Sequence, residues 1–224
     1  MSKYMIHYCE NRQWYVFDYL VSSMIEQGID RNNIMFWPDL IGNGCLKSFI
    51  NSMHHISQNF SLEDGIWHLQ DDVIISKDFK KQTELYDDGI VCGFCPSTRP
   101  EVKEGIVYGE DMWFSFPCMR MPNHVADSFI KWFDAFCVGN KQYRMWIKAN
   151  KYNDTFFHIY VEDYYNNVPI LNLSPNIVDH IDFLLGGSTI NQGRKEPIRA
   201  LYFEDIDLID ELEVKLNEEK INKD

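Results

Sequence analysis

Long apolar runs are missing from this sequence. The longest, such as GIVCGF at residues 89–94, are far shorter than the ~20 residues of a membrane-spanning helix. The N-terminal residues MSKYMIHYCE turn polar before they form the apolar core of a signal peptide. We therefore expect a cytoplasmic protein with no membrane partner.

Cysteines are few and scattered. The six cysteines lie in apolar surroundings, unlike the dense disulfide framework of a small secreted scaffold. Cys92 and Cys95 form one CxxC pair, but a structural zinc site usually takes two more ligands at similar spacing, and a redox pair usually opens a helix. We therefore expect reduced thiols.

Basic residues are also in short supply. The 21 lysines and arginines are outnumbered by 34 aspartates and glutamates, which gives a formal net charge of −13. Such a charge repels long polyanions at a distance and argues against a general coat for nucleic acid or for an anionic membrane. Much of the acid lies in residues 204–224, whose apolar positions indicate an acidic amphipathic helix. These positions are Leu208, Ile209, Leu212, Val214 and Leu216.

No linker rich in proline, glycine or serine divides the chain, and no repeat is visible. We expect a single domain over residues 1–200 and an acidic helix or tail over residues 201–224. Strands are predicted near residues 4–8, 33–37, 65–69, 89–94, 112–120 and 170–173, and helices near 14–27, 45–57, 77–86, 123–136, 143–148 and 154–165. This alternation predicts an α/β fold, a three-layer sandwich with a mostly parallel central sheet.

Two adjacent acids, Asp71 and Asp72, follow the apolar strand in the stretch WHLQDDVIIS. Ligands of parallel α/β sheets bind at the carboxyl ends of the strands, where these acids fall. Neighbouring carboxylates stay ionised only if a cation or hydrogen-bond donors compensate them. Hard oxygen ligands favour Mg²⁺ or Mn²⁺, held together with the phosphates of a substrate. An ordinary turn, with Asp72 capping the next loop, is the alternative.

The stretch WHLQDDVIIS resembles the DxD-type signature of GT-A fold nucleotide-sugar glycosyltransferases. Gln70 stands where many members have the first acid, which leaves Asp72, helped by Asp71, as the metal ligand. The resemblance implies a Rossmann-like GT-A fold, a nucleotide-sugar donor such as a UDP-sugar, and Mn²⁺ or Mg²⁺ as the cofactor.

The N-terminal half is similar to the nucleotide-binding half of that family. One strand ends near Arg12, a second ends at Asp39, and the turn at Asn43 opens a helix that carries Lys47. The resemblance implies that Asp39 bonds the base or ribose and that Arg12, Asn43 and Lys47 approach the nucleotide. Ordinary turn chemistry before a helix is the alternative.

Asp154 begins the helix-like segment NDTFFHIYVEDYY. Family members keep a carboxylate at this point that acts, in inverting enzymes, as the base on the acceptor hydroxyl, so the resemblance implies that role for Asp154. Glu162 and Asp163 would lie ~12 Å further along the helix. The alternative for Asp154 is a plain N-cap, which is compatible with the catalytic role.

His180 follows the last strand and resembles the C-terminal histidine of the family, which returns to the metal and the diphosphate. A neutral imidazole is a competent metal ligand. The glycine-rich loop that contains Gly187 and Ser188 would bring backbone N–H groups to phosphate. Lys195, close to Arg194 and Arg199, would neutralise the departing nucleotide.

A local reversal of charge precedes Asp154. Basic residues recur at three- and four-residue spacing and are interleaved with Tyr143 and Trp146, as a polyanion with exposed bases would require. The basic residues are Lys141, Arg144, Lys148 and Lys151. A solvated helix with buried aromatic rings is the alternative.

The whole sequence resembles small bacteriophage glycosyltransferases, some of which decorate hydroxymethylated pyrimidines in DNA. A modified base in phage DNA is therefore the first acceptor to consider, with a wall teichoic acid precursor or another glycan as alternatives. Two other classes remain open. A metal-dependent phosphoesterase would use Asp71, Asp72 and His180 with two ions, and a non-catalytic acidic protein would mimic nucleic acid.

Overall fold

The sheet that organises the fold is mixed, with five of its seven strands running in one direction and two running against them. The structure is a computed structural model, and it describes residues 2–39, 43–98, 105–107, 116–150, 153–164, 169–187 and 196–221. Seven strands pair in the order β2-β1-β3-β7-β5-β8-β6. They are β1 (Lys3–Cys9), β2 (Ile34–Asp39), β3 (Gly65–Gln70), β5 (Ile90–Cys92), β6 (Gly105–Val107), β7 (Cys118–Pro122) and β8 (Ile170–Asn172). The pairs β1/β2, β1/β3 and β5/β8 are parallel, and the other three pairs are antiparallel, so β6 and β7 run against the other five strands.

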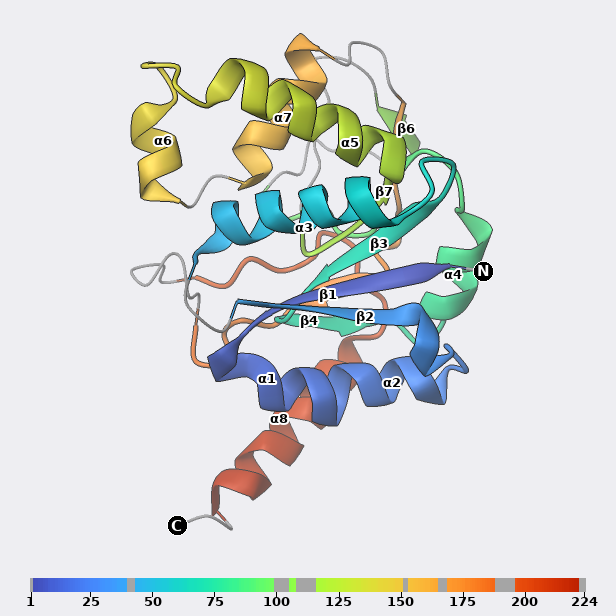
Figure 1. Cartoon of the computed structure of the whole chain (residues 1–224). Helices are drawn as coiled ribbons and strands as arrows, with labels where there is room; N and C mark the ends of the chain where they lie inside the picture. Colours follow the sequence, from blue (N-terminus) through green and yellow to red (C-terminus); the bar gives the residue numbers. More distant parts are fainter. Residues whose placement is uncertain are drawn as a thin grey trace.

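Helices cover both faces of this sheet, so the chain forms an α/β three-layer sandwich (Figure 1). They are α1 (Gln13–Tyr15), α2 (Val21–Glu26), α3 (Cys45–Asn59), α4 (Phe79–Leu85), α5 (Asn123–Trp132), α6 (Arg144–Ala149), α7 (Asn153–Asp163) and α8 (Ile206–Ile221). The π-helical turns Val16–Leu20 and Phe133–Cys137 continue α1 into α2 and extend α5, and short 3₁₀ turns lie at Glu10–Arg12 and Arg31–Asn33. No described helix has the length and apolar composition needed to cross a membrane.

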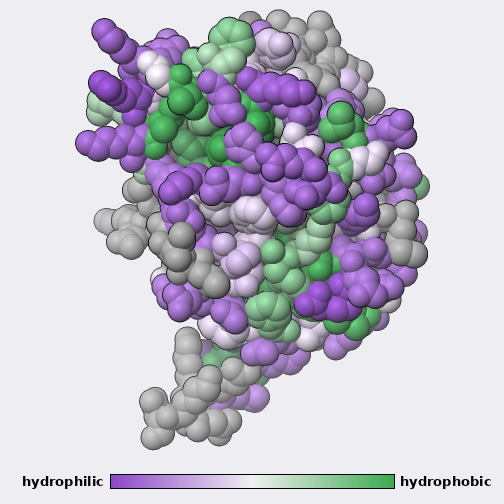
Figure 2. All heavy atoms as spheres, viewed as in Figure 1, coloured by the Kyte–Doolittle hydropathy of each residue, from purple (hydrophilic) through white to green (hydrophobic). Residues whose placement is uncertain are grey.

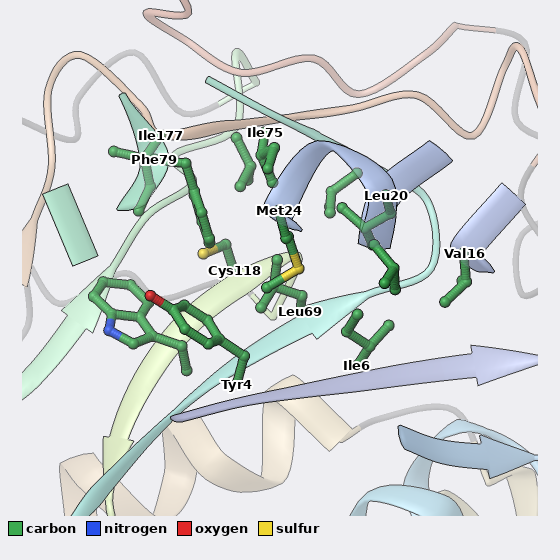
Figure 3. Close-up of a cluster of buried hydrophobic side chains, with 14 of the residues drawn as sticks. Tyr4, Ile6, Val16, Leu20, Met24, Leu69, Ile75, Phe79, Cys118 and Ile177 are labelled. Atoms are coloured by element: carbon green, nitrogen blue, oxygen red, sulfur yellow. The ribbon is translucent and has the colours of Figure 1, made fainter. Parts of the chain in front are cut away.

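Side-chain alternation along the strands builds two separate cores. Tyr4 and Ile6 of β1 point to one face, where they pack with Leu20 and Met24 (Figure 3). Met5, between them, points to the opposite face and joins the core formed with α3, α5 and α7. The sheet is therefore buried on both faces, as its near-continuous apolar strands predict.

The acidic C-terminal segment is a helix that packs on the domain. Ile209, Leu212 and Leu216 of α8 are buried in the same core as α1 and α2. At its start, Lys77 Nζ lies 2.5 Å from the Asp207 carboxylate. The acidic residues of α8 thus occupy the solvent side, and its apolar stripe anchors it.

Three short strands escaped the sequence prediction, β6 of the main sheet and two that pair with each other. β4 (Val73–Ile75) and β9 (Val178–His180) form a separate antiparallel ribbon, in which Val73 pairs with His180. Three residues are too few to display a period of two. This ribbon matters for function because it carries His180 to the end of β3, directly beside the pair of acids.

Candidate functional site

A cavity of 290 Å³ opens at the carboxyl edge of the parallel strands β2, β1 and β3, between the sheet and α3. Its lining includes Arg12, Asp39, Asp71 and Asp72, four of the residues that the sequence singled out. A larger cavity of 360 Å³ near Asn172 contains none of the predicted residues. The smaller one is therefore the candidate site.

Parallel register brings these residues to one edge. Cys9 pairs with Asp39 across β1 and β2, and His7 pairs with Gln70 across β1 and β3. The ends of three strands thus lie side by side, and the residues just beyond them, Arg12 and Asp71, face the same cavity. This is the place at which α/β sheets commonly bind their ligands.

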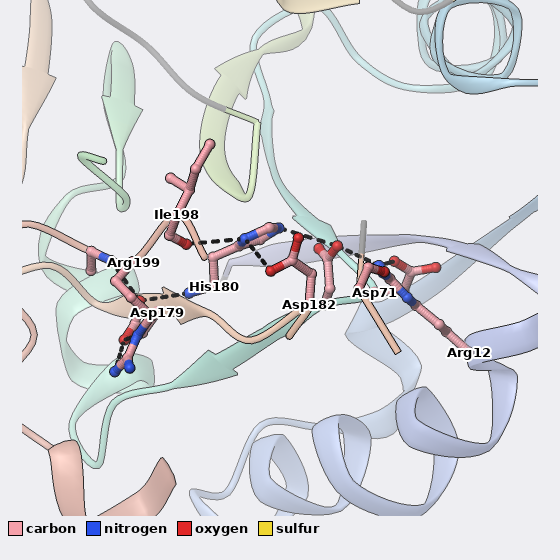
Figure 4. Close-up of polar contacts among 10 residues, drawn as sticks. Arg12, Asp71, Asp179, His180, Asp182, Ile198 and Arg199 are labelled. Carbon is pink, nitrogen blue, oxygen red and sulfur yellow. Dashed lines mark hydrogen bonds and ion pairs between the residues drawn. The ribbon is translucent and has the colours of Figure 1, made fainter. Parts of the chain in front are cut away.

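Arg12 binds both acids. Its Nη1 lies 2.9 Å from Asp71 Oδ1 and also contacts Asp72 Oδ2. Its Nη2 donates to the carbonyl of Gly187 at 2.8 Å. The backbone N–H of Cys9 donates to the other oxygen of Asp71 at 2.7 Å. Figure 4 shows Arg12 and Asp71 facing one another from separate elements. Arg12 therefore supplies part of the positive charge that we expected a metal ion to provide for the two acids.

The two acids have different electrostatic environments. Burial alone would raise the pKa of Asp72, but His180 and Arg12 outweigh burial and lower it. For Asp71, burial and the charge of Asp72 outweigh Arg12 and raise the pKa. Burial opposes the charge on Arg12, yet the two carboxylates raise its pKa further. Asp72 is therefore the firmly ionised member of the pair.

His180 contacts Asp72 in a way that either a proton or a shared metal ion would satisfy. Its Nδ1 donates to the carbonyl of Ile198 at 3.2 Å, and its Nε2 lies 3.1 Å from Asp72 Oδ2. A neutral imidazole that donates from Nδ1 presents a lone pair at Nε2, and a lone pair opposite a carboxylate needs a proton or a shared metal ion. Neighbouring ligands of an octahedral Mg²⁺, with bonds of ~2.1 Å, lie ~3 Å apart.

Asp72 also has an oxygen to offer. Its Oδ1 is buried and makes no hydrogen bond within the described part of the chain. Asp72 and His180 therefore fit two ligands of a hard divalent ion. Over the described ranges no group of three or more histidine, cysteine or acidic side chains is arranged for a metal. An ion held there would have to complete its coordination with substrate oxygens and water, as Mg²⁺ usually does.

Asp39 orders the entrance to α3. Its carboxylate accepts from the backbone N–H groups of Asn43, at 2.6 Å, and Gly44, at 2.9 Å. Asn43 also accepts from the side chain of Asn150. Asn150 Oδ1 in turn accepts from the N–H of Lys47 at 2.7 Å, while the Lys47 side chain is exposed. These contacts are the turn chemistry considered above. Asp39 lines the cavity, whereas Asn43 and Lys47 are only sequence neighbours of lining residues.

Gly44 is required by this arrangement. Its φ is +84°, and a Cβ there would approach the Asn150 side chain to 2.4 Å. Asn150 itself, which ends α6, adopts the left-handed conformation with φ of 56°. The end of α6 is therefore fixed against the start of α3, beside the cavity.

Asp154 lies in the first turn of α7 and is exposed. It does not line the cavity, but its neighbour Asn153 does, and Asn153 Oδ1 accepts from the thiol of Cys45 at 2.6 Å. Burial raises the pKa of Cys45 to about 12, and the negative charges of Asp154, Asp39 and Asp72 add to that effect. The charge of Asp154 therefore affects the pKa of the same thiol as the charges of Asp39 and Asp72.

The glycine-rich loop differs from the sequence expectation at Gly187. Its N–H donates to the carbonyl of Asp182 at 2.7 Å, and its carbonyl accepts from Arg12. In this structure, Gly187 therefore supports Arg12 and its N–H already has a partner. Ser188 and Lys195 lie outside the described residues. Arg199 donates to Asp179 and lies on the far side of His180.

Sequence reasoning missed two histidines in the cavity. His7 of β1 and His68 of β3 both line it, and His7 Nε2 lies 2.9 Å from His68 Nδ1. The signal was present, since each histidine occupies an α3-facing position in an otherwise apolar strand. A polar side chain at a core position of a strand that ends at the acids identifies the floor of the cavity.

Comparison of the chain with protein-family models and with curated proteins finds no match. The residues of the site are therefore the basis for assigning a function to this chain.

Proposed function

We propose that this chain is a metal-dependent glycosyltransferase of the GT-A type. It would move a sugar from a nucleotide-sugar donor, in the first instance a UDP-sugar, to an acceptor hydroxyl. The supporting observation is the buried group of Arg12, Asp71, Asp72 and His180, the first three of which line a 290 Å³ cavity on the carboxyl edge of the sheet. Asp72 Oδ1, which has no partner among the described residues, suits a diphosphate carried with Mn²⁺ or Mg²⁺.

The residues of the chain divide the work. Arg12 fixes both carboxylates and contributes positive charge close to the leaving diphosphate. Asp72 and His180 would hold the ion, which supplies Lewis-acid stabilisation of the leaving group when bound. Asp154 would accept the proton of the acceptor hydroxyl, because it is exposed beside the cavity and free to meet a second substrate.

The acceptor would reach the site along α6. Lys141, Arg144 and Lys148 are exposed, and Trp146 keeps 39% of its surface exposed while its ring contacts Phe156. Figure 2 shows apolar side chains gathered in this region beside projecting hydrophilic ones. Positive charge with an accessible ring suits a polyanion with exposed bases. We propose DNA that contains a hydroxymethylated pyrimidine as the acceptor.

A transfer assay tests the proposal. The chain is incubated with UDP- or GDP-sugars, Mn²⁺ and DNA containing 5-hydroxymethylcytosine, and both the released nucleoside diphosphate and the mass of the DNA are measured. We expect coupled release and mass gain that EDTA abolishes. Nucleotide release without mass gain would direct the search to another acceptor, and hydrolysis of simple phosphate esters without any sugar transfer would replace the proposal with a phosphoesterase.

Two acids on one helix provide the matched variants. Asp154→Asn should lower transfer by ~10²- to 10⁴-fold, the usual cost of losing a general base. Asp163→Asn removes an exposed acid at the opposite end of α7 and should leave transfer unchanged. Equal activity of both variants would contradict an inverting reaction with Asp154 as the base and favour a retaining one.

A further inference from the structure

The floor of the cavity differs chemically from its mouth. His7 and His68 lie on adjacent strands, on the face that carries α3, with ring centroids 5.2 Å apart in a stacked arrangement. Phe49 and Phe116 line the same cavity, and their centroids are 4.5 Å apart. The charged side chains Arg12, Asp71 and Asp72 stand at the other side. The cavity thus runs from charged groups to rings.

One atom of this floor has no partner. His68 is 1% exposed, and its Nε2 makes no hydrogen bond to any residue that the structure describes. Buried ring nitrogens are normally paired, since leaving one unpaired costs free energy. His68 Nδ1 is already bonded to His7 Nε2 at 2.9 Å. The remaining nitrogen is therefore available for a molecule in the cavity that His68 lines.

The two histidines are neutral at physiological pH. Burial lowers the pKa of His7 to about 4, and burial together with His7 lowers the pKa of His68 well below its usual value. A neutral floor in the same cavity as Phe49 and Phe116 offers no charge to a phosphate group. A sugar would leave several hydroxyls unpaired against the phenylalanine rings. A planar, uncharged ring with a polar edge fits both conditions.

The hydrogen bond between the histidines can run in either direction. If His7 donates, His68 Nε2 carries a proton and acts as a donor; if His68 donates, its Nε2 is an acceptor. The pair can therefore match either polarity on the edge of a heterocycle. Volume is also adequate, because 290 Å³ lies near the lower end of the ~300–1,000 Å³ range of small-molecule sites.

We propose that the His7–His68 floor binds a nucleobase, with His68 Nε2 hydrogen bonded to its edge and the contacting rings of Phe49 and Phe116 together on one side of it. The inference rests on the proposed function for the placement of phosphates at the mouth of the cavity. Two sources of the base share this chemistry. One is the nucleotide of the donor, and the other is an unstacked base of a nucleic-acid acceptor.

Calorimetric titration of the full chain tests the proposal. The probes are uridine, cytidine, thymidine, adenosine and guanosine diphosphates, with inorganic pyrophosphate as the probe without a base. We expect one base to be preferred, and His68→Phe to weaken its binding about five- to tenfold, as expected for one lost hydrogen bond. Pyrophosphate binding should not change. His124→Phe, at an exposed histidine, is the matched control.

A second arm identifies the source of the base. Single-stranded DNA with 5-hydroxymethylcytosine is titrated against the same strand with abasic sites. Sensitivity of nucleotide binding to His68→Phe assigns the floor to the donor, and sensitivity of the intact strand alone assigns it to the acceptor. If neither ligand prefers a base, or if His68→Phe changes neither, the proposal is overturned.

A measurement on the unmodified chain guards against a misfolded variant. The imidazole ¹⁵N resonances of His68 should shift when the preferred nucleotide or strand is added, and should not shift with pyrophosphate. Unmoved resonances at saturating ligand would overturn the proposal even if His68→Phe failed to fold. Base binding without sugar transfer would retain this inference and reject the proposed function, whereas transfer with His68 indifferent to the base would do the reverse.

Discussion

Two buried aspartates, Asp72 and Asp179, each pair with an arginine, yet their surroundings differ in one decisive respect. Asp179 is fully buried and accepts from Arg199 Nε at 2.7 Å, from the N–H of Ala200 at 2.6 Å and from the N–H of His180 at 2.7 Å. Both of its oxygens have partners. Asp72 has Arg12 and His180 on one oxygen and nothing described on the other.

The difference separates a structural acid from one that has an oxygen to offer a ligand. A buried carboxylate whose oxygens are all bonded fixes a chain crossing, here between β9 and the segment that holds Arg199. An unbonded oxygen on a buried carboxylate lowers the stability of the fold, and a ligand in the cavity can recover that loss by binding the oxygen. The two groups are linked through His180, as Figure 4 shows. The Asp179 group contacts His180 only through the backbone N–H, whereas Asp72 contacts its ring.

The sharpest test compares Asp72→Asn with Asp179→Asn. The first should reduce sugar transfer by at least ~100-fold, because a charge-stabilising group is lost. The second should lower the free energy of unfolding by about 3 kcal/mol, because a buried ion pair is broken, with transfer per folded molecule retained within about threefold. Transfer rates and urea unfolding curves measure both. The distinction between the two acids would be wrong if both variants lost the same amount of transfer activity and of unfolding free energy.

Arginine replacements extend the comparison to the partners. Arg12 is buried between two acids, whereas the Arg199 side chain is 32% exposed. Arg12→Ala should therefore cost about 3–5 kcal/mol of unfolding free energy, and Arg199→Ala about 3 kcal/mol, because Asp179 is buried but keeps two backbone N–H donors. Chemical denaturation measures both. A larger cost at Arg199 would show that the Asp179 group is the main electrostatic anchor of this edge.

Sequence pattern foretold the alternation of strands and helices and the edge at which the acids lie, because both follow from local periodicity and strand polarity. The family resemblance implied that Asp72 and His180 hold one metal ion; the two side chains lie in contact, and the metal stays a prediction. The sequence pattern did not foretell that Arg12 would bind both acids, since that contact joins residues about 60 positions apart. Nor did it distinguish the environment of Asp71 from that of Asp72, because the sequence alone does not show which carboxylate oxygens are hydrogen bonded.

The sequence pattern could not predict the direction of the antiparallel strand β7 or the pairing of β4 with β9, for a different reason. Their direction depends on how the chain returns to the sheet, and that is set by tertiary packing rather than by composition. The expected parallel direction holds for β1, β2, β3, β5 and β8, whereas β7, inserted between β3 and β5, runs against them. The roles assigned to Ser188 and Lys195 stay predictions.

The two histidines at the floor of the cavity should make the free energy of unfolding depend on pH. The pKa of His7 is lowered from 6.5 to about 4, so the unfolded chain takes up this proton before the folded one does. Stability from His7 is complete above pH 6.5 and is lost as the pH falls towards 4. A shift of this size corresponds to about 3 kcal/mol, and we expect about 2 kcal/mol because His7 is only half-buried.

Urea unfolding at pH 7, 5.5 and 4.5 measures this loss. The double variant His7→Gln, His68→Gln should lose much less stability over that range than the unmodified chain, and His124→Gln should behave like the unmodified chain. Asp72, whose pKa is lowered, contributes at pH values above its ordinary 3.8 and is lost only below that value. A stability loss confined to the region below pH 4 would assign the acid sensitivity to the carboxylates alone.

The smallest expected effect lies outside both buried groups, on α6. Lys148→Ala removes one exposed charge, so it should weaken binding of a DNA acceptor by only a few fold and reduce the slope of log affinity against log salt by ~0.7–0.9, according to the strand type. Affinity for the nucleotide donor should not change, because Lys148 does not line the cavity. Lys215→Ala on α8 is the control, being an exposed lysine on the opposite layer. If Lys148→Ala and Lys215→Ala shift the salt slope equally, α6 has no special part in binding the acceptor, and the polyanion must approach by another face.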